Sequence, residues 1–184
     1  MSGHESLKPS EWVRRFAPLI APGGSVLDLA CGQGRHARHL AGLGYRVEAV
    51  DRDGAALAAL SGVAGVETRC ADLEASAWPY EADRFDGIVV ANYLYRPLAA
   101  DLLAALRPGG VLIYETFALG NEKLGRPSNP EFLLRADELM QWVQGRLQIL
   151  AFEQGRVERP KPAVIQRICA LRRRTEECRL DFTP

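Results

Sequence analysis

The first features of this sequence that could do chemistry are a small-residue loop and a carboxylate downstream of it. The loop follows the apolar run 25–30 and holds Gly32 and Gly34, with Ala37 completing the pattern G-x-G-x-x-G/A. Such a loop lets the backbone run close to a ligand, and the helix behind it offers free N–H groups. Asp51 ends a second apolar run 19 residues after Gly32, where it can accept both hydroxyls of an adenosine ribose. A tight turn without a ligand is the alternative for the loop alone, but the pair predicts a nucleoside-containing cofactor.

Asp28 separates two possible cofactors. The glycine pattern is typical of nicotinamide or flavin dinucleotides, whereas Asp28 with the same glycines forms D-x-x-x-G-x-G, which is typical of loops that hold S-adenosylmethionine. A carboxylate inside the strand suits a ligand with an ammonium group and a positive sulfur, and it would repel a pyrophosphate. Asp72 can accept a hydrogen bond from an adenine amino group, with Leu73 against the ring; its alternative is a turn or helix cap. These residues favour S-adenosylmethionine, and an NAD-dependent oxidoreductase is the alternative.

Alternating strand and helix patterns must position these residues. Strands are predicted at 25–30, 46–51, 66–73, 85–92, 111–117, 147–157 and 163–173, and helices at 6–20, 34–44, 53–63, 96–110 and 131–145. This alternation predicts an α/β fold: a Rossmann-like, seven-stranded, mostly parallel sheet with helices on both faces. The last two strands have no helix between them, so they should form an antiparallel hairpin at the sheet edge. That hairpin departs from the all-parallel dinucleotide fold.

The combination of motifs resembles the class I S-adenosylmethionine-dependent methyltransferases over nearly all of residues 6–174. The matching segments are VLDLACGQGRHA, AVDRD, ADL, FDGIVVANYLY and LRPGGVLIYETF. The chain is similar in particular to a small bacterial tellurite-resistance-type, or generic methyltransferase-domain, subfamily, although the family's first loop glycine is Ala30 here. The resemblance implies a cofactor site formed by Asp28, Ala30, Gly32 and Gly34 near the amino-acid part, Asp51 and Arg52 near the ribose, Asp72 and Leu73 at the adenine, and Ala91 and Asn92 near the sulfonium.

Three residues are candidates for catalysis on the substrate side. Tyr93 and Tyr95 follow the fourth strand and could wall a pocket around the transferred methyl, whose cation-like carbon favours aromatic faces; helix-start packing is their alternative. Glu115 ends the fifth strand and could take a proton or bind a cationic substrate; a salt bridge, for example to Arg126, is its alternative. Enzymes of this fold that methylate amino groups of nucleic acids carry [N/D]-P-P-[Y/F] after the fourth strand. This chain lacks those prolines.

Several other polar residues have open interpretations. The long loop 118–130 could close over the site through Asn121, Arg126 and Asn129, or be an ordered surface loop. Arg96 could bind an acidic substrate or be solvated. His36 and His39, which have arginine neighbours, are expected on a solvated helix face. In the leading helix, Ser10 is a possible cap, and Trp12, Phe16 and Leu19 share a face.

Bulk properties bound the function. The 184 residues are expected to form one domain with a leading helix at 6–20, a core at 25–174 and a tail at 175–184. The formal net charge of zero argues against nucleic acid and anionic lipid as partners, and no apolar run is long enough for a membrane span. The four cysteines, Cys31, Cys70, Cys169 and Cys178, have no metal-site spacing, so we expect no metal, reduced thiols and a cytoplasmic location.

The expected function is direct in-line transfer of a methyl group from S-adenosylmethionine to an N, O or S nucleophile of a small molecule, leaving S-adenosylhomocysteine. A non-catalytic, cofactor-binding regulatory protein is the alternative. A monomer and a homodimer both fit this expectation.

Overall fold

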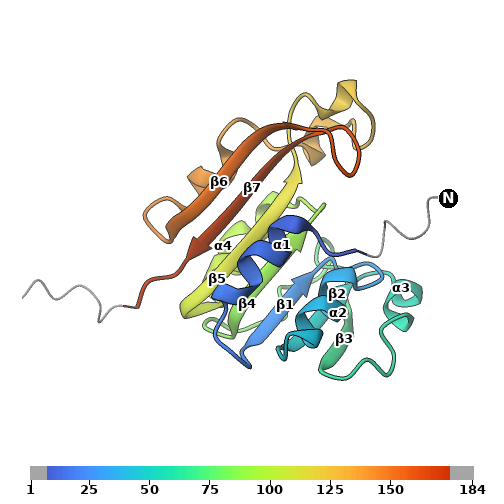
Figure 1. The fold of residues 1–184 in the computed structure, drawn as a ribbon, viewed down its shortest axis with the longest axis vertical. Helices are drawn as coiled ribbons and strands as arrows, with labels where there is room; N and C mark the ends of the chain where they lie inside the picture. Colours follow the sequence, from blue (N-terminus) through green and yellow to red (C-terminus); the bar gives the residue numbers. More distant parts are fainter. Residues whose placement is uncertain (1–7, 175–184) are drawn as a thin grey trace, which may run out of the picture.

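A seven-stranded sheet with the strand order β3-β2-β1-β4-β5-β7-β6 organises the molecule (Figure 1). The computed structural model describes residues 8–174. The strands are β1 (Ser25–Leu29), β2 (Arg46–Asp51), β3 (Val66–Cys70), β4 (Phe85–Ala91), β5 (Leu106–Phe117), β6 (Gln148–Val157) and β7 (Ala163–Leu171). Strands β1 to β5 pair in parallel, whereas β7 pairs antiparallel with both β5 and β6. The predicted sheet and its antiparallel edge hairpin are confirmed.

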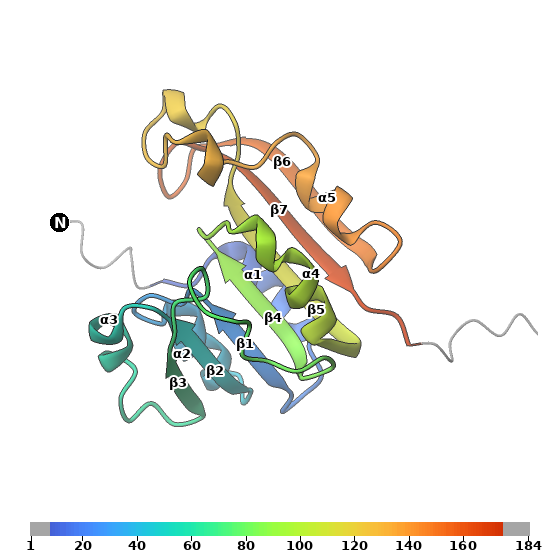
Figure 2. The same ribbon diagram turned by 180° about the vertical axis from the view of Figure 1, so that it is seen from behind.

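Helices cover both faces of the sheet. On one face α1 (Glu11–Phe16), α2 (Arg35–Gly42) and α3 (Gly54–Ala58) contribute to one buried apolar cluster. On the other face, seen in Figure 2, α4 (Ala99–Ala105) and α5 (Glu138–Val143) contribute to the second cluster. The 3-10 turns are η2 (Ala17–Leu19), η3 (Arg96–Leu98), η4 (Asn121–Lys123) and η5 (Pro130–Phe132).

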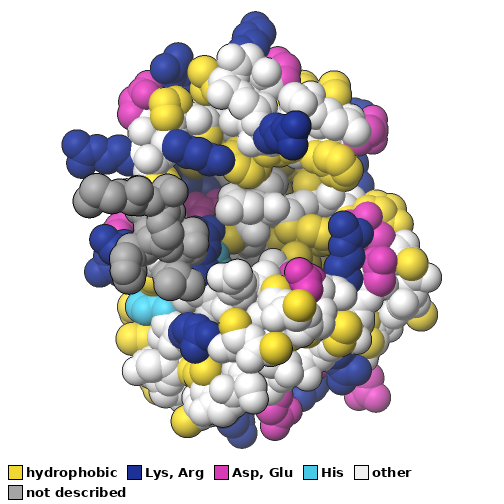
Figure 3. Space-filling model, turned by 90° about the vertical axis from the view of Figure 1, so that its right-hand side faces the viewer, with side chains coloured by type: hydrophobic (Ala, Val, Ile, Leu, Met, Phe, Trp, Pro, Cys, Tyr) yellow, Lys and Arg dark blue, Asp and Glu magenta, His cyan; other side chains and the backbone are white. Residues whose placement is uncertain are grey.

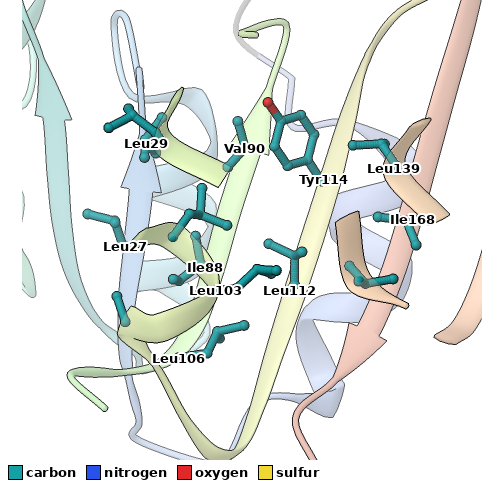
Figure 4. Close-up of a cluster of buried hydrophobic side chains, with 14 of the residues drawn as sticks. Leu27, Leu29, Ile88, Val90, Leu103, Leu106, Leu112, Tyr114, Leu139 and Ile168 are labelled. Atoms are coloured by element: carbon teal, nitrogen blue, oxygen red, sulfur yellow. The ribbon is translucent and has the colours of Figure 1, made fainter. Parts of the chain in front are cut away.

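The core follows from the apolar runs of the central strands. All five residues of β1 are buried, and alternate side chains point to opposite faces. Figure 4 shows the α4 and α5 side, where strand residues pack against helix residues: Leu27, Leu29, Ile88, Val90, Leu103, Leu106, Leu112, Tyr114, Leu139 and Ile168. Burial of each large apolar side chain contributes about 1.5–3 kcal/mol, and it fixes which side of each strand faces the helices.

The leading helix is shorter than predicted. Ser10 caps it as expected, because its hydroxyl accepts hydrogen bonds from the N–H groups of Trp12 and Val13. The α-helix ends at Phe16 and continues as a 3-10 turn that begins at Ala17, because Pro18 has no N–H for the helical ladder. Leu19 is therefore 50% exposed and does not share the buried face of Trp12. Residues 6–7 of the predicted helix lie outside the described residues, as do the predicted tail and Cys178.

The predicted helix at 131–145 is wrong over its first half. The chain forms η5, then Leu134 pairs with Ala118 in an isolated β-bridge, and only α5 is helical. Leu133 and Leu134 are fully buried there, so tertiary packing overrides the local helical pattern. Other boundaries shift less: β3 ends at Cys70 instead of 73, and β5 starts already at Leu106.

The described part of the chain was also compared with what a membrane span, a disulfide or a metal site would require. None of the helices between residues 8 and 174 is both long and apolar enough to cross a membrane. Cys31, Cys70 and Cys169 are free thiols, and this part of the chain holds no group of three potential metal ligands.

Candidate functional site

A cavity of about 200 Å³ lies at the carboxyl ends of β1, β2 and β3 and beside the loop after β4. It is lined by Ala30, Val50, Asp51, Arg52, Ala71, Asp72, Leu73, Glu74 and Tyr93. The structure thus brings together five of the residues predicted to hold a cofactor, and one predicted catalytic residue, at the sheet edge where this fold binds ligands. A larger cavity of about 370 Å³ lies at the opposite edge, between Ser25 and Arg107, and contains none of the predicted residues.

The glycine loop has the backbone that a close approach to a ligand needs. Ala30, Gly32 and Gly34 all have positive φ, at 53°, 55° and 74°. At Gly34 a Cβ would lie 2.3 Å from a side-chain carbon of Leu60, whereas at Gly32 no atom lies within 4 Å of a Cβ position. Open space in front of Gly32 is what a ligand pressed against the backbone requires. The positive φ of Ala30 also fits the glycine that is usual at this position in the family that the sequence resembles.

Asp28 has a structural role that the sequence did not reveal. It is 1% exposed, and its Oδ2 accepts a hydrogen bond of 2.8 Å from the N–H of Ala37, in the first turn of α2. Burial raises the pKa of Asp28 to about 7, although this hydrogen bond and the charge of Arg35 act in the opposite direction. The carboxylate therefore ties β1 to α2 behind the glycine loop. Its contact with a cofactor ammonium stays a prediction.

Asp51 links two of the loops around the cavity. Its Oδ2 accepts a hydrogen bond of 2.8 Å from the N–H of Gly32, and its Oδ1 accepts one of 2.9 Å from the N–H of Asp53. Each oxygen keeps further acceptor capacity, since a carboxylate offers about four lone-pair sites. The side chain is thus held in one orientation beside the cavity, which is the arrangement that ribose recognition would need.

Asp72 has the geometry of the turn cap that was its alternative interpretation. Its Oδ1 accepts a hydrogen bond of 3.0 Å from the N–H of Glu74, while the side chain also lines the cavity. Leu73 is 7% exposed and belongs to both the core and the cavity wall. A capping role and an adenine contact are compatible, because only one of the two oxygens is used.

The tyrosines after β4 have different surroundings. Tyr93 lines the cavity, and its carbonyl accepts a hydrogen bond of 2.8 Å from the Tyr114 hydroxyl. Burial raises the pKa of the Tyr93 phenol, so it remains protonated at neutral pH. The Tyr95 hydroxyl donates a bond of 3.3 Å to the carbonyl of Glu74 and so joins the loops after β3 and β4. Asn92, with a φ of 58°, is exposed at the end of β4, whose last residue is Ala91.

Glu115 lies on the other side of the sheet edge from these tyrosines. Alternation along β5 points Tyr114 toward α5 and Glu115 toward α1. Burial raises the pKa of Glu115, while a hydrogen bond from Ser10 and the charges of Arg167 and Arg35 oppose that shift. The suggested salt bridge to Arg126 does not form within the described residues, and Glu115 does not line the cavity with Tyr93.

Sequence reasoning missed two interactions beside the site. His36 is 3% exposed rather than solvated, because α1 packs on it and its Nε2 accepts a hydrogen bond of 3.2 Å from the N–H of Ser10. Burial lowers its pKa to about 3, so it is neutral.

Arg96 is neither free nor solvated: it pairs with Glu138 at 2.7 Å and donates to the carbonyls of Glu131 and Leu133 at 2.7 and 2.9 Å. Both contacts join segments far apart in sequence, and no local pattern signals them.

Known proteins resemble this chain in sequence. Residues 26–110 match the model of a methyltransferase domain family. The chain is 36% identical over 108 residues to a protein-L-isoaspartate O-methyltransferase of Chlorobaculum tepidum, covering 56% of this chain and 49% of that protein. It is 32% identical over 140 residues to hemagglutinin 1 of Eikenella corrodens, covering 71% and 46%. The chain therefore spans about half the length of the curated relatives it matches.

Solved structures share the fold at low sequence identity. TehB from Haemophilus influenzae superposes with a TM-score of 0.71 at 20% identity, over 95% of this chain and 63% of that one. The 1,6-didemethyltoxoflavin-N1-methyltransferase of Burkholderia thailandensis, solved with bound 1,6-didemethyltoxoflavin and S-adenosylhomocysteine, superposes with a TM-score of 0.63 at 20% identity, over 89% of this chain and 79% of that one.

Proposed function

We propose that this chain, which belongs to the class I S-adenosylmethionine-dependent methyltransferases, transfers a methyl group from that cofactor to an N, O or S nucleophile of a small molecule. The observation that carries the proposal is the convergence of Ala30, Asp51, Asp72 and Leu73 on one cavity at the carboxyl edge of the sheet. These residues come from three separate segments that the parallel strands bring to one edge, and their side-chain types are those that a nucleoside cofactor needs.

Each cofactor residue has a role that its surroundings support. Asp51, already oriented by Gly32 and Asp53, would accept the ribose hydroxyls. Asp72 and Leu73 would contact the adenine, and Arg52 would flank the ribose. The backbone from Ala30 to Gly34, with Asp28 behind it, would hold the amino-acid part near Ala91 and Asn92.

Catalysis would depend mainly on alignment. Bound S-adenosylmethionine supplies an activated methyl group on a positive sulfur, so the acceptor needs no strong base. The protein would hold the acceptor in line and exclude water, and such positioning can supply up to about 7–11 kcal/mol. Tyr93, at the cavity wall, would face the transferred methyl. Tyr95 would hold the loop that carries Tyr93, and Glu115 would act from the α1 side, on the acceptor or its proton.

The remaining parts of the proposal follow from composition and fold. We propose a single domain with its core at 25–174, a cytoplasmic location, no nucleic-acid or membrane partner, and a monomer or homodimer. Apart from the long loop 118–130, little of the described part of the chain covers the carboxyl edge, which suits a small acceptor or a second copy that completes the pocket.

Asp51→Ala tests the cofactor assignment. We expect S-adenosylhomocysteine binding, measured by calorimetry, to weaken about tenfold or more, because a paired hydroxyl contact contributes about 1.5–3 kcal/mol. Asp101→Ala is the matched control, since Asp101 is exposed on α4. An unchanged affinity in Asp51→Ala would refute the ribose assignment.

Incubation with methyl-labelled cofactor and a metabolite extract tests the activity itself. Label appearing in a low-molecular-weight product supports the proposal. Tight S-adenosylhomocysteine binding without any labelled metabolite supports the non-catalytic alternative instead.

A further inference from the structure

The loop that follows β5 lies beyond the carboxyl edge of the sheet, and we call this loop and the turn between β6 and β7 the upper wall (Figure 1). Residues 118–134 of the loop rise past the carboxyl end of β5, together with the turn between β6 and β7 (Figures 1 and 2). Figure 3, which views the molecule from the side toward which β1, β4 and β5 point, shows a hollow below this region. Hydrophobic side chains gather along the hollow, and Lys and Arg side chains lie above it.

This wall is held firmly in place. Asn121 is 2% exposed; its amide donates to the carbonyl of Pro127 at 3.0 Å and accepts from the N–H of Val164 at 3.2 Å. The far end of the loop is held by Arg96, which binds two of its carbonyls as well as Glu138. The hydrogen bonds of Asn121 and Arg96 therefore hold the loop backbone, and with it the exposed side chains, in a defined position.

Three large apolar side chains are exposed on the loop 118–134. Leu119, Leu124 and Phe132 are 48%, 37% and 50% exposed. Exposed apolar groups that gather beside a ligand site mark a binding surface more often than isolated ones do.

The charges of the two walls differ in sign. The lower wall, at the cofactor cavity, carries three carboxylates, Asp51, Asp72 and Glu74, and one cation, Arg52. The upper wall carries exposed cations that form no ion pair within residues 8–174: Lys123, Arg126, Arg159 and Lys161. The loop also carries two carboxylates: Glu122, which is turned back to accept a hydrogen bond of 2.7 Å from the N–H of Gly120, and Glu131, which is exposed, so the cations of the upper wall outnumber its unpaired carboxylates.

We propose that the methyl acceptor is an amphipathic acid, a small molecule with an apolar or aromatic body and an anionic group. This inference rests on the proposed function and names its substrate class. The apolar body lies against Leu119, Leu124 and Phe132, and the anionic group faces the cations of the upper wall. The excess of carboxylates on the lower wall favours binding of the positively charged cofactor and disfavours binding of an anionic acceptor at the same place. The two ligands are therefore directed to different walls by their charges.

Two fluorescent probes with the same ring system test the proposal. The probes are 8-anilinonaphthalene-1-sulfonate and the uncharged N-phenyl-1-naphthylamine, titrated into protein saturated with S-adenosylhomocysteine so that the cofactor cavity is filled. We expect the sulfonate to bind more tightly than the amine. Arg126→Glu should weaken the sulfonate about fivefold, with little change for the amine, because reversal of an exposed charge changes binding by about 1 kcal/mol. Phe132→Ser should weaken both probes.

Controls come from the opposite edge of the molecule. Arg46→Glu and Leu43→Ser change an exposed cation and an exposed leucine away from the site, and both should leave probe binding unchanged. Equal binding of the two probes, or an Arg126→Glu variant that binds both like the wild type, would overturn the acceptor class. Sedimentation with phosphatidylglycerol vesicles that depends on Phe132 would assign the wall to a membrane surface and also overturn it. Failure of the wild type to bind S-adenosylhomocysteine in calorimetry would instead contradict the proposed function.

Discussion

Ala30 is a residue whose type and backbone conformation are in conflict. Its φ of 53° is a left-handed conformation that costs a residue with a Cβ about 1–2 kcal/mol. Ala30→Gly should therefore stabilise the protein by about 0.5–1 kcal/mol, after the extra chain entropy of glycine is subtracted. Urea denaturation measures the change.

Gly32→Ala is the matched reverse of this substitution. Its φ of 55° is nearly the same, and no neighbouring atom would contact the new Cβ, so only backbone strain should change. We expect a loss of about 1 kcal/mol. A loss of stability in Ala30→Gly would mean that the strain at Ala30 is relieved in another way.

Asp28 should make stability depend on pH. Its folded-state pKa is about 7, above the ordinary value of 3.8, so the native state holds the proton more tightly than the unfolded state does. The contribution of Asp28 to stability is therefore largest below pH 4 and is lost as the pH rises to about 7, by at most about 1.4 kcal/mol per pH unit. Asp28→Asn keeps an acceptor for the Ala37 N–H and should remove this dependence.

The measurement is the difference between the wild-type and Asp28→Asn free energies of unfolding from pH 4.5 to 8. Taking the difference cancels other titrating groups, such as Glu115, whose pKa is also raised by burial. A difference that stays constant across this range would contradict the raised pKa. If the ammonium prediction also holds, the variant binds S-adenosylhomocysteine more weakly at pH 8.

At the scale of elements, the pair of Arg96 and Glu138 joins the loop after β4 to the start of α5. Arg96→Met leaves the Glu138 carboxylate, 10% exposed, without its cation. Breaking a buried pair costs about 3–5 kcal/mol, and we expect about 2–3 here because the Arg96 side chain is 27% exposed. Urea denaturation measures the loss of stability. Arg156→Met is the control, because both side chains of the Arg156–Glu158 pair are exposed. We expect that substitution to cost less than about 1 kcal/mol of stability. Equal losses of stability in Arg96→Met and Arg156→Met would contradict a stabilising role for the buried pair of Arg96 and Glu138.

The elements also show where sequence reasoning works and where it stops. The strands were predictable because β1 and β4 are apolar runs buried on both faces, and the alternation of elements then places Asp51 and Asp72 at one edge. The segment 131–137 was not predictable, because Leu133 and Leu134 are buried and Leu134 forms a bridge with Ala118. Arg96 also contacts Glu138, which is 42 residues away in sequence. The prediction that His36 is solvated was wrong for the same reason. Its burial depends on α1 and on a hydrogen bond from Ser10, which is 26 residues away in sequence.

At the scale of the whole molecule, the two sheet edges should respond differently to the cofactor. The amino-edge cavity is the larger one, but two of its charged residues are already paired: Glu48 pairs with Arg69 at 2.8 Å, and Arg107 pairs with Asp86 at 3.1 Å. The carboxyl edge instead presents Asp51 and Asp72 with spare acceptor capacity. Only the carboxyl edge should therefore gain contacts when a ligand binds.

S-adenosylhomocysteine at 100 times its Kd should stabilise the fold by about 2.7 kcal/mol. For a chain of this size that corresponds to a rise in Tm of about 5–11 °C. Hydrogen exchange should slow in residues 30–37, 51–54 and 71–74, which surround the carboxyl-edge cavity, and stay unchanged at 46–48 and 65–67 of the amino edge. Arg46→Glu, at the amino edge, should keep the full Tm shift, whereas Asp51→Ala should lose much of it. Slowed exchange confined to the amino edge would place the cofactor in the larger cavity and overturn the assignment of the site.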